Sequence, residues 1–180
     1  MGRVFYFPTK SKGFNKTLSD LMKEAKNNNS FLANLPKGII TSTFSDLEKI
    51  LRISIHNVLI NEECCNSDYF HCGTYVSKVI SDTAKNPPSS FYVIDYLSKI
   101  EGTRDILQWQ QAANICFLIC TIFDGKCNRG LMNYSSYEKM GIGLYSTYYG
   151  KSKNEIGYLM SDNYKTMVDV TREALKTLST

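Results

Sequence analysis

The stretch 103–124 reads TRDILQWQQAANICFLICTIFD, and it is the longest run in which apolar side chains dominate and nothing breaks a helix. From Ala112 to Phe123 almost every side chain is apolar or carries a thiol, so this half offers no face to water. About twenty residues at a rise of about 1.5 Å give a helix of roughly 30 Å, the span of a small domain. The stretch therefore predicts a central buried helix from Thr103 to Asp124, with Thr103 as its N-cap and other helices covering most of its sides.

Helical spacing of apolar residues predicts further helices on both sides of the central one. Ser45 and Glu48 fit a capping box, in which each side chain bonds the backbone amide of the other. Val4–Phe7 and Ile39–Thr43 are short β-prone runs, which predict a minor two-stranded ribbon near the N-terminus. The expected fold is all-α, a bundle of six or seven helices around the central one. The last helix is expected to kink near Ser161. Apart from the central helix, helices are predicted over about 15–26, 45–61, 67–85, 91–100, 134–149 and 154–178.

Length and composition favour one folded unit. The chain has 180 residues, 43% of them hydrophobic, with 12 Tyr and 9 Phe, and this is enough to bury a core without a disulfide or a cofactor. Pro87–Pro88 is the clearest break, but neither half has a composition that marks it as separate. We therefore predict a single helical domain over residues 1–180.

Charge and cysteine usage bear on compartment and partners. The net charge is +4, with +5 in residues 1–40 and −1 in the remaining 140 residues. The lysines of residues 1–40 are too sparse for a nucleic-acid interface, so no nucleic-acid partner is expected. The six cysteines do not form the framework of a small disulfide scaffold, and the apolar run before Pro8 is too short for a signal peptide. The apolar run of the central helix is also shorter than the roughly 18–20 residues that span a bilayer. These features predict a cytoplasmic protein with reduced cysteines and no membrane span.

Two cysteines of the central helix are candidate metal ligands. Cys116 and Cys120 lie four residues apart and so share one helix face, where Cys127, Cys72 or His71 could complete a site. The alternative is that both thiols pack in the core as small apolar groups, as reduced cysteine usually does. The spacing lacks the paired CxxC units of most zinc sites, which favours the core interpretation.

Aromatic residues are concentrated near the C-terminus, where seven of the twelve tyrosines fall between residues 134 and 164. Such rings line a ligand pocket, or they pack at the rim of a core with each hydroxyl reaching water. Gly141 and Gly143 interrupt the same region, and we predict that they let its helix approach the Cys116–Cys120 face of the central helix closely. The candidate ligand-binding residues are Trp109, Asn114, Tyr137, Tyr145, Tyr148 and Tyr149.

No motif specifies a reaction. The chain has no glycine-rich phosphate loop, no HExxH and no GxSxG, so no catalytic residue is predicted and enzymatic activity is left open. The pattern favours a cytosolic helical interaction or regulatory module that binds a protein partner or forms a homodimer. The alternative is a helical protein with a pocket lined by Tyr and Cys, which would bind haem, a metal or a small apolar ligand.

Overall fold

The computed structural model describes residues 44–88, 90–102, 105–123 and 132–178, and the regular elements in this part are all helices. The predicted all-α fold is therefore confirmed for the described residues, whereas the helix predicted over 15–26 and the predicted ribbon lie outside them. The single-domain assignment stays a prediction. The seven helices are α2 (Phe44–Asn61), α3 (Ser67–Lys85), α4 (Val93–Gly102), α5 (Leu107–Ile122), α7 (Tyr134–Ser152), α8 (Glu155–Asp162) and α9 (Tyr164–Thr177).

Asparagine side chains cap three of these helices. Each accepts a hydrogen bond from a backbone amide in the first turn, which would otherwise have no partner within the helix. The accepting residues are Asn66 for α3, Asn133 for α7 and Asn154 for α8, at 2.6, 2.9 and 3.1 Å. The starts of α3 and α7 fall where the sequence predicts them, and α2 begins at Phe44, one residue before the predicted capping box.

The central helix is shorter than predicted. The carboxylate of Asp105 accepts the backbone amide of Leu107 at 2.9 Å, and the carbonyl of Asp105 accepts the amide of Gln108 at 3.2 Å. These two bonds begin α5 at Leu107, so the prediction that Thr103 caps the helix is wrong. Thr103 itself lies outside the described residues.

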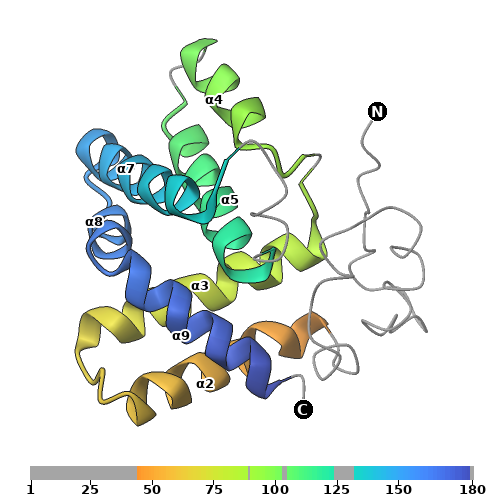
Figure 1. Ribbon diagram of the computed structural model, residues 1–180, viewed down its shortest axis with the longest axis vertical. Coiled ribbons are helices and arrows are strands. Elements are labelled where there is room, and N and C mark those ends of the chain that lie inside the picture. Colours follow the sequence, from red (N-terminus) through yellow and green to blue (C-terminus); the bar gives the residue numbers. More distant parts are fainter. Residues whose placement is uncertain (1–43, 89, 103–104, 124–131, 179–180) are drawn as a thin grey trace.

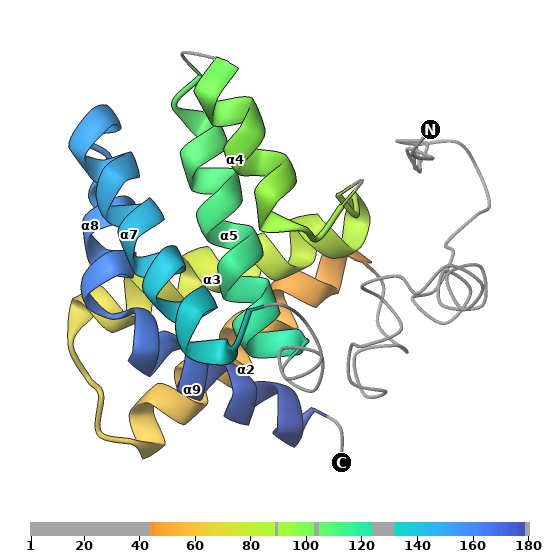
Figure 2. The ribbon, with the colours of Figure 1, turned by 45° about the horizontal axis from the view of Figure 1, so that its top comes forward.

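α5 lies in the middle of the bundle, as predicted. It runs between α4 and α7, and α9 packs against it as well (Figures 1 and 2). Every side chain from Ile115 to Thr121 is buried, so the apolar half of the helix is covered on all faces. No helix in the described part of the chain combines the length and the apolar content that crossing a bilayer requires.

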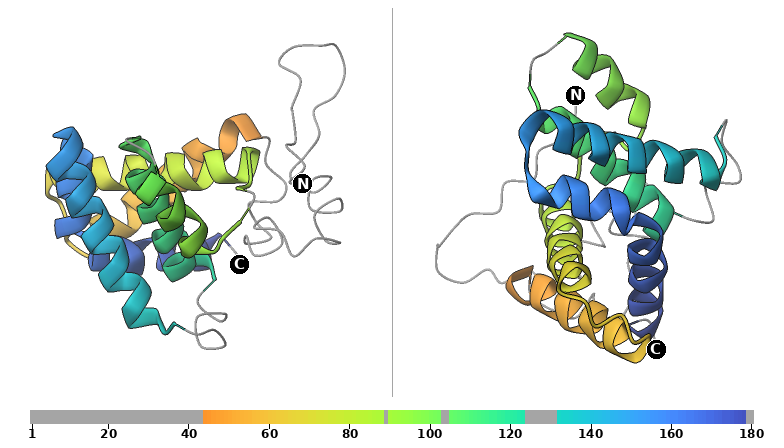
Figure 3. Two further views of the ribbon diagram at one scale, coloured as in Figure 1. Left: turned by 90° about the horizontal axis from the view of Figure 1, so that it is seen from above. Right: turned by 90° about the vertical axis from the view of Figure 1, so that its left-hand side faces the viewer.

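A second group of helices, α2, α3 and α9, packs beside α5. α2 contacts both α3 and α9, and the crossing of α2 with α3 is close because of Gly73 (Figure 3). A methyl group at Gly73 would lie 3.0 Å from Cγ2 of Ile55 and 3.1 Å from Cδ2 of His56. The α2–α3 contact therefore depends on the missing side chain.

The last predicted helix is divided into two. α8 ends at Asp162 and α9 begins at Tyr164, and the two run in different directions (Figure 3, right). Asn163 lies between them and bonds the carbonyl of Leu159 with its side-chain amide at 2.9 Å and with its backbone amide at 3.0 Å. A short polar side chain that competes for backbone partners ends a helix more readily than it continues one. The predicted kink near Ser161 is thus a full break two residues later.

Candidate functional site

Two of the predicted ligand-binding residues meet in a polar group between α3, α5 and α7. Oδ1 of Asn114 accepts hydrogen bonds from the hydroxyls of Tyr75 at 2.8 Å and Tyr145 at 2.6 Å. The side-chain amide of Gln110 donates to the Tyr75 hydroxyl at 3.1 Å. Gln110 and Asn114 share a face of α5 because they lie four residues apart. We call these four residues the amide–phenol cluster.

Burial keeps both phenols of the cluster protonated. It raises the pKa of Tyr75 to about 12 and the pKa of Tyr145 well above its ordinary value of 10. Both hydroxyls are therefore hydrogen-bond donors at neutral pH, and the two lone pairs of one carbonyl oxygen accept both. Tyr145 has no exposed surface, whereas Tyr75, Gln110 and Asn114 are only partly buried. The cluster thus extends from the core to the surface.

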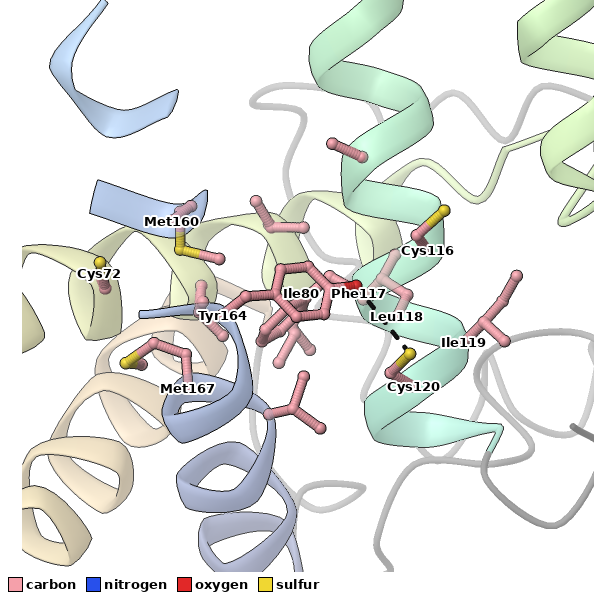
Figure 4. Close-up of a cluster of buried hydrophobic side chains, with 14 of the residues drawn as sticks. Cys72, Ile80, Cys116, Phe117, Leu118, Ile119, Cys120, Met160, Tyr164 and Met167 are labelled. Carbon is pink, nitrogen blue, oxygen red and sulfur yellow. Dashed lines mark hydrogen bonds between the residues drawn. The ribbon is translucent and has the colours of Figure 1, made fainter. Parts of the chain in front are cut away.

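The two candidate metal ligands share one face of α5, as predicted, and both are completely buried. The Tyr164 hydroxyl reaches from α9 to the Cys120 sulfur at 3.9 Å (Figure 4). Burial raises the pKa of the Cys116 thiol far above its usual range, and the neighbouring Cys120 adds to this. A protonated thiol is a poor nucleophile and must lose its proton to bind a metal.

The other proposed metal ligands do not join Cys116 and Cys120. Cys72 is buried on α3, where burial raises its pKa to about 12, while His71 beside it is exposed. In the described residues no three or more His, Cys, Asp or Glu side chains gather in a way that could hold a metal ion. Cys127 lies outside these residues, so the metal site stays a prediction. The described geometry fits the alternative of thiols packed in the core.

The two glycines of α7 differ in their surroundings. Gly141 is buried, and a methyl group there would lie 2.7 Å from Cε2 of Tyr164. Gly143 is exposed, and a methyl group there would meet nothing within 4 Å. The predicted close approach is therefore found at Gly141 alone. Its nearest neighbour is the Tyr164 ring of α9 and not the predicted face of α5, because the hydroxyl end of that ring lies against both Gly141 and Cys120.

The remaining predicted ligand-binding residues do not join the cluster. Tyr148 is buried and Tyr137 is half-buried against the core. Trp109 lies at the start of α5, and Nζ of Lys151 at the end of α7 lies 5.3 Å from the centre of its ring. Tyr149, also near the end of α7, has its ring centre 5.7 Å from that of Tyr158 on α8.

Exposed apolar side chains lie at the start of α5 and where α7 meets α8, two places that the contact of Lys151 with Trp109 brings together. Four of the eight large hydrophobic residues that are exposed in the described part lie where α5 begins and α7 meets α8, with exposed fractions of 37, 54, 38 and 49%. Together with Trp109 they form what we call the aromatic end; its members are Ile106, Leu107, Trp109, Tyr149 and Tyr158.

Sequence reasoning missed several residues of both groups. Tyr75 follows Cys72 and precedes Val79 at helical spacing, so its inward position on α3 was readable from the pattern. Its hydrogen bond to Asn114 was not, because the two residues are 39 positions apart. Leu107 and Tyr158 continue apolar stripes, and a stripe does not show which of its members stays exposed.

The comparisons with known proteins give no relative: no protein-family model, no curated protein and no solved structure matches this chain. What the protein does must therefore be argued from its chemistry. The described residues offer a pair of converging hydrogen-bond donors and an apolar, aromatic surface. The buried thiols Cys72 and Cys116 are held in the protonated form and do not provide an activated nucleophile.

Proposed function

We propose that this protein is a helical interaction module and that it binds another protein surface through the aromatic end. The observation that carries the proposal is the concentration of exposed apolar side chains at that end of the bundle. Single exposed apolar residues are normal on a protein surface, but a group of them marks a contact site. Tyr and Trp are also the residue types that contribute most to binding at protein interfaces.

The charges around the aromatic end suit a protein partner. Lys151 and Lys153 are exposed beside the rings, and Nζ of Lys153 lies 5.8 Å from the centre of the Tyr149 ring. Glu155 and Asp105 are exposed at the starts of α8 and α5. An apolar centre with charged residues of both signs around it is the usual composition of a protein–protein interface. Because both signs are present, a second copy of the chain is one partner that fits. We also propose that the protein lies in the cytoplasm, because thiols stay reduced there.

The oligomeric state of the full chain tests the proposal. Analytical ultracentrifugation over a wide range of concentration compares the wild type with the double variant Leu107→Ser/Tyr158→Ser. The matched control is Ile53→Ser/Ile60→Ser on α2, whose side chains are 50% and 53% exposed. If the chain dimerises through the aromatic end, the first variant weakens the dimer by more than about tenfold and the control does not.

If the wild type is monomeric, a second experiment tests whether the aromatic end binds a different protein. A photo-crosslinking amino acid at Tyr158 should then give one discrete adduct in a cell extract, and Leu107→Ser should abolish it. The same crosslinker at Asp169, an exposed residue of α9, serves as the control. If both positions give the same diffuse products and the chain is monomeric, the aromatic end is not an interaction site.

A further inference from the structure

The amide–phenol cluster places two hydrogen-bond donors on a single oxygen atom. The Tyr75 oxygen accepts from Gln110, so its one proton is directed to Asn114. The Tyr145 hydroxyl donates to the same atom from α7. The carbonyl oxygen of Asn114, and not its nitrogen, lies at this point, at distances of 2.8 and 2.6 Å that are typical of O–H···O bonds.

Two phenols that converge on one oxygen recognise a carbonyl group whatever molecule carries it. The Tyr75 and Tyr145 hydroxyls come from different helices, α3 and α7, so the packing of these helices brings the two donors to one point. A neutral carbonyl suits them better than a carboxylate, because Tyr145 is completely buried and a charge beside it would lose its hydration. A ligand carbonyl would restore both bonds that Asn114 now accepts.

We propose that Tyr75 and Tyr145 form a binding site for the carbonyl oxygen of a small neutral ligand of the amide class, and that the Asn114 side chain occupies this site when no ligand is bound. Asn114, Tyr75 and Gln110 are only partly buried, so the cluster borders the surface on their side, and this is the side from which a ligand would enter. When the ligand binds, the Asn114 carboxamide turns toward water, where its hydrogen bonds are satisfied. The proposal does not depend on the interaction function of the aromatic end.

Replacing Asn114 and supplying its functional group in solution tests the proposal. Asn114→Ala removes a carboxamide, and formamide is the molecule that matches the missing group. We expect formamide to raise the thermal midpoint of Asn114→Ala in a saturable way relative to the wild type in the same solution. If Asn114→Ala does not fold, the same experiment is read by circular dichroism as recovery of helix on addition of formamide. A second pair, Asn114→Gly with acetamide, repeats the test with a larger missing group.

Two controls decide between this proposal and other readings. Adding Tyr145→Phe to Asn114→Ala removes one donor and should abolish the response to formamide. Acetone, which has a carbonyl and no N–H group, replaces acetamide with Asn114→Gly and tests the opposite polarity, in which the phenol oxygens accept hydrogen bonds from the Asn114 nitrogen. The proposal is overturned if formamide has no saturable effect on Asn114→Ala, if Asn114→Ala/Tyr145→Phe responds equally, or if acetamide stabilises Asn114→Gly and acetone does not. A wild type that binds formamide at least about tenfold more weakly than Asn114→Ala supports the occupancy of the site by Asn114.

Discussion

The two halves of α5 bury their side chains in different ways. In the second half, the completely buried Phe117 ring packs edge-to-face on Tyr164 at a centroid distance of 5.6 Å. Nε of Arg172 donates to the carbonyl of Cys120 at 2.9 Å and so bonds a carbonyl in the last turns of the helix. In the first half, Asn114 holds two phenols through one oxygen, and Leu107 at the very start is 54% exposed.

This difference places the side chains that stabilise the fold in the second half of α5 and the side chains that can bind other molecules in the first half. Apolar packing has no alternative partner in water, so the second half has one arrangement and its free energy depends on shape. Hydrogen bonds near the surface and exposed rings exchange partners at little net cost, because water or a ligand replaces what the fold provides. The first half of α5 is therefore where a ligand or a partner can compete with internal contacts, and this is where both proposed sites lie.

The largest expected effect is on the free energy of unfolding and concerns the buried second half of α5. Phe117→Ala should lower the free energy of unfolding by about 3–5 kcal/mol, since a large buried ring is lost and leaves a cavity. Leu107→Ala removes an exposed side chain and should change it by less than about 0.5 kcal/mol. Urea denaturation of both variants measures the two values. Similar losses at the two positions would show that the halves of α5 do not differ in this way.

The sequence predicted the second half of α5 much better than the first. An unbroken run of apolar and thiol side chains has one outcome, burial on all faces, and the burial from Ile115 to Thr121 follows directly from it. The amide–phenol cluster depends on contacts between residues 31 and 39 positions apart, and a pattern that gives the inward face of a helix does not identify the residue it meets. Of the predicted ligand-binding residues, only Asn114 and Tyr145 meet there.

Local polar chemistry explains the remaining differences in the helices. The break between α8 and α9 depends on the side chain of Asn163, which bonds the carbonyl of Leu159. The start of α5 depends on Asp105, whose carboxylate accepts the backbone amide of Leu107. Both residues were readable as helix-ending or helix-starting types, but an apolar stripe that continues across them favoured a longer helix. At these two positions the polar residue marks the helix boundary better than the apolar stripe does.

A smaller effect, on the thermal midpoint, is expected at the contact between α7 and Tyr164. Gly141→Ala should lower the thermal midpoint, because the added methyl meets the Tyr164 ring, which Phe117 and Tyr145 prevent from moving aside. The overpacking cost of about 1–3 kcal/mol exceeds the gain in helix propensity of about 1 kcal/mol. Gly143→Ala is the matched control on the same helix, since open space surrounds it. It should raise the midpoint, and an increase for both variants would mean that the Tyr164 contact is loose.

The smallest effect concerns the partly buried side chain of His56. His56 lies between α2 and α3, with its ring 5.0 Å from that of Phe70 and its Nε2 3.3 Å from the hydroxyl of Thr74. Burial lowers the pKa of His56 below its usual value of 6.5, the backbone hydrogen bond with Phe70 opposes this, and the charge of Arg52 adds to the lowering. The folded chain thus favours the neutral ring.

Because the pKa of His56 is lower in the folded state than in the unfolded state, acid destabilises the folded protein. Below pH 6.5 the unfolded chain takes up a proton on His56 before the folded chain does, so stability is fully present above that pH and falls as the pH drops toward the lowered value. Below the lowered value the loss from this residue is complete. Urea denaturation of the wild type and of His56→Gln at constant ionic strength, from pH 7.5 downward, measures the contribution as the difference between the two slopes. The wild type should lose more stability than the variant over this interval, and equal slopes would show that the contact between α2 and α3 tolerates the charged ring.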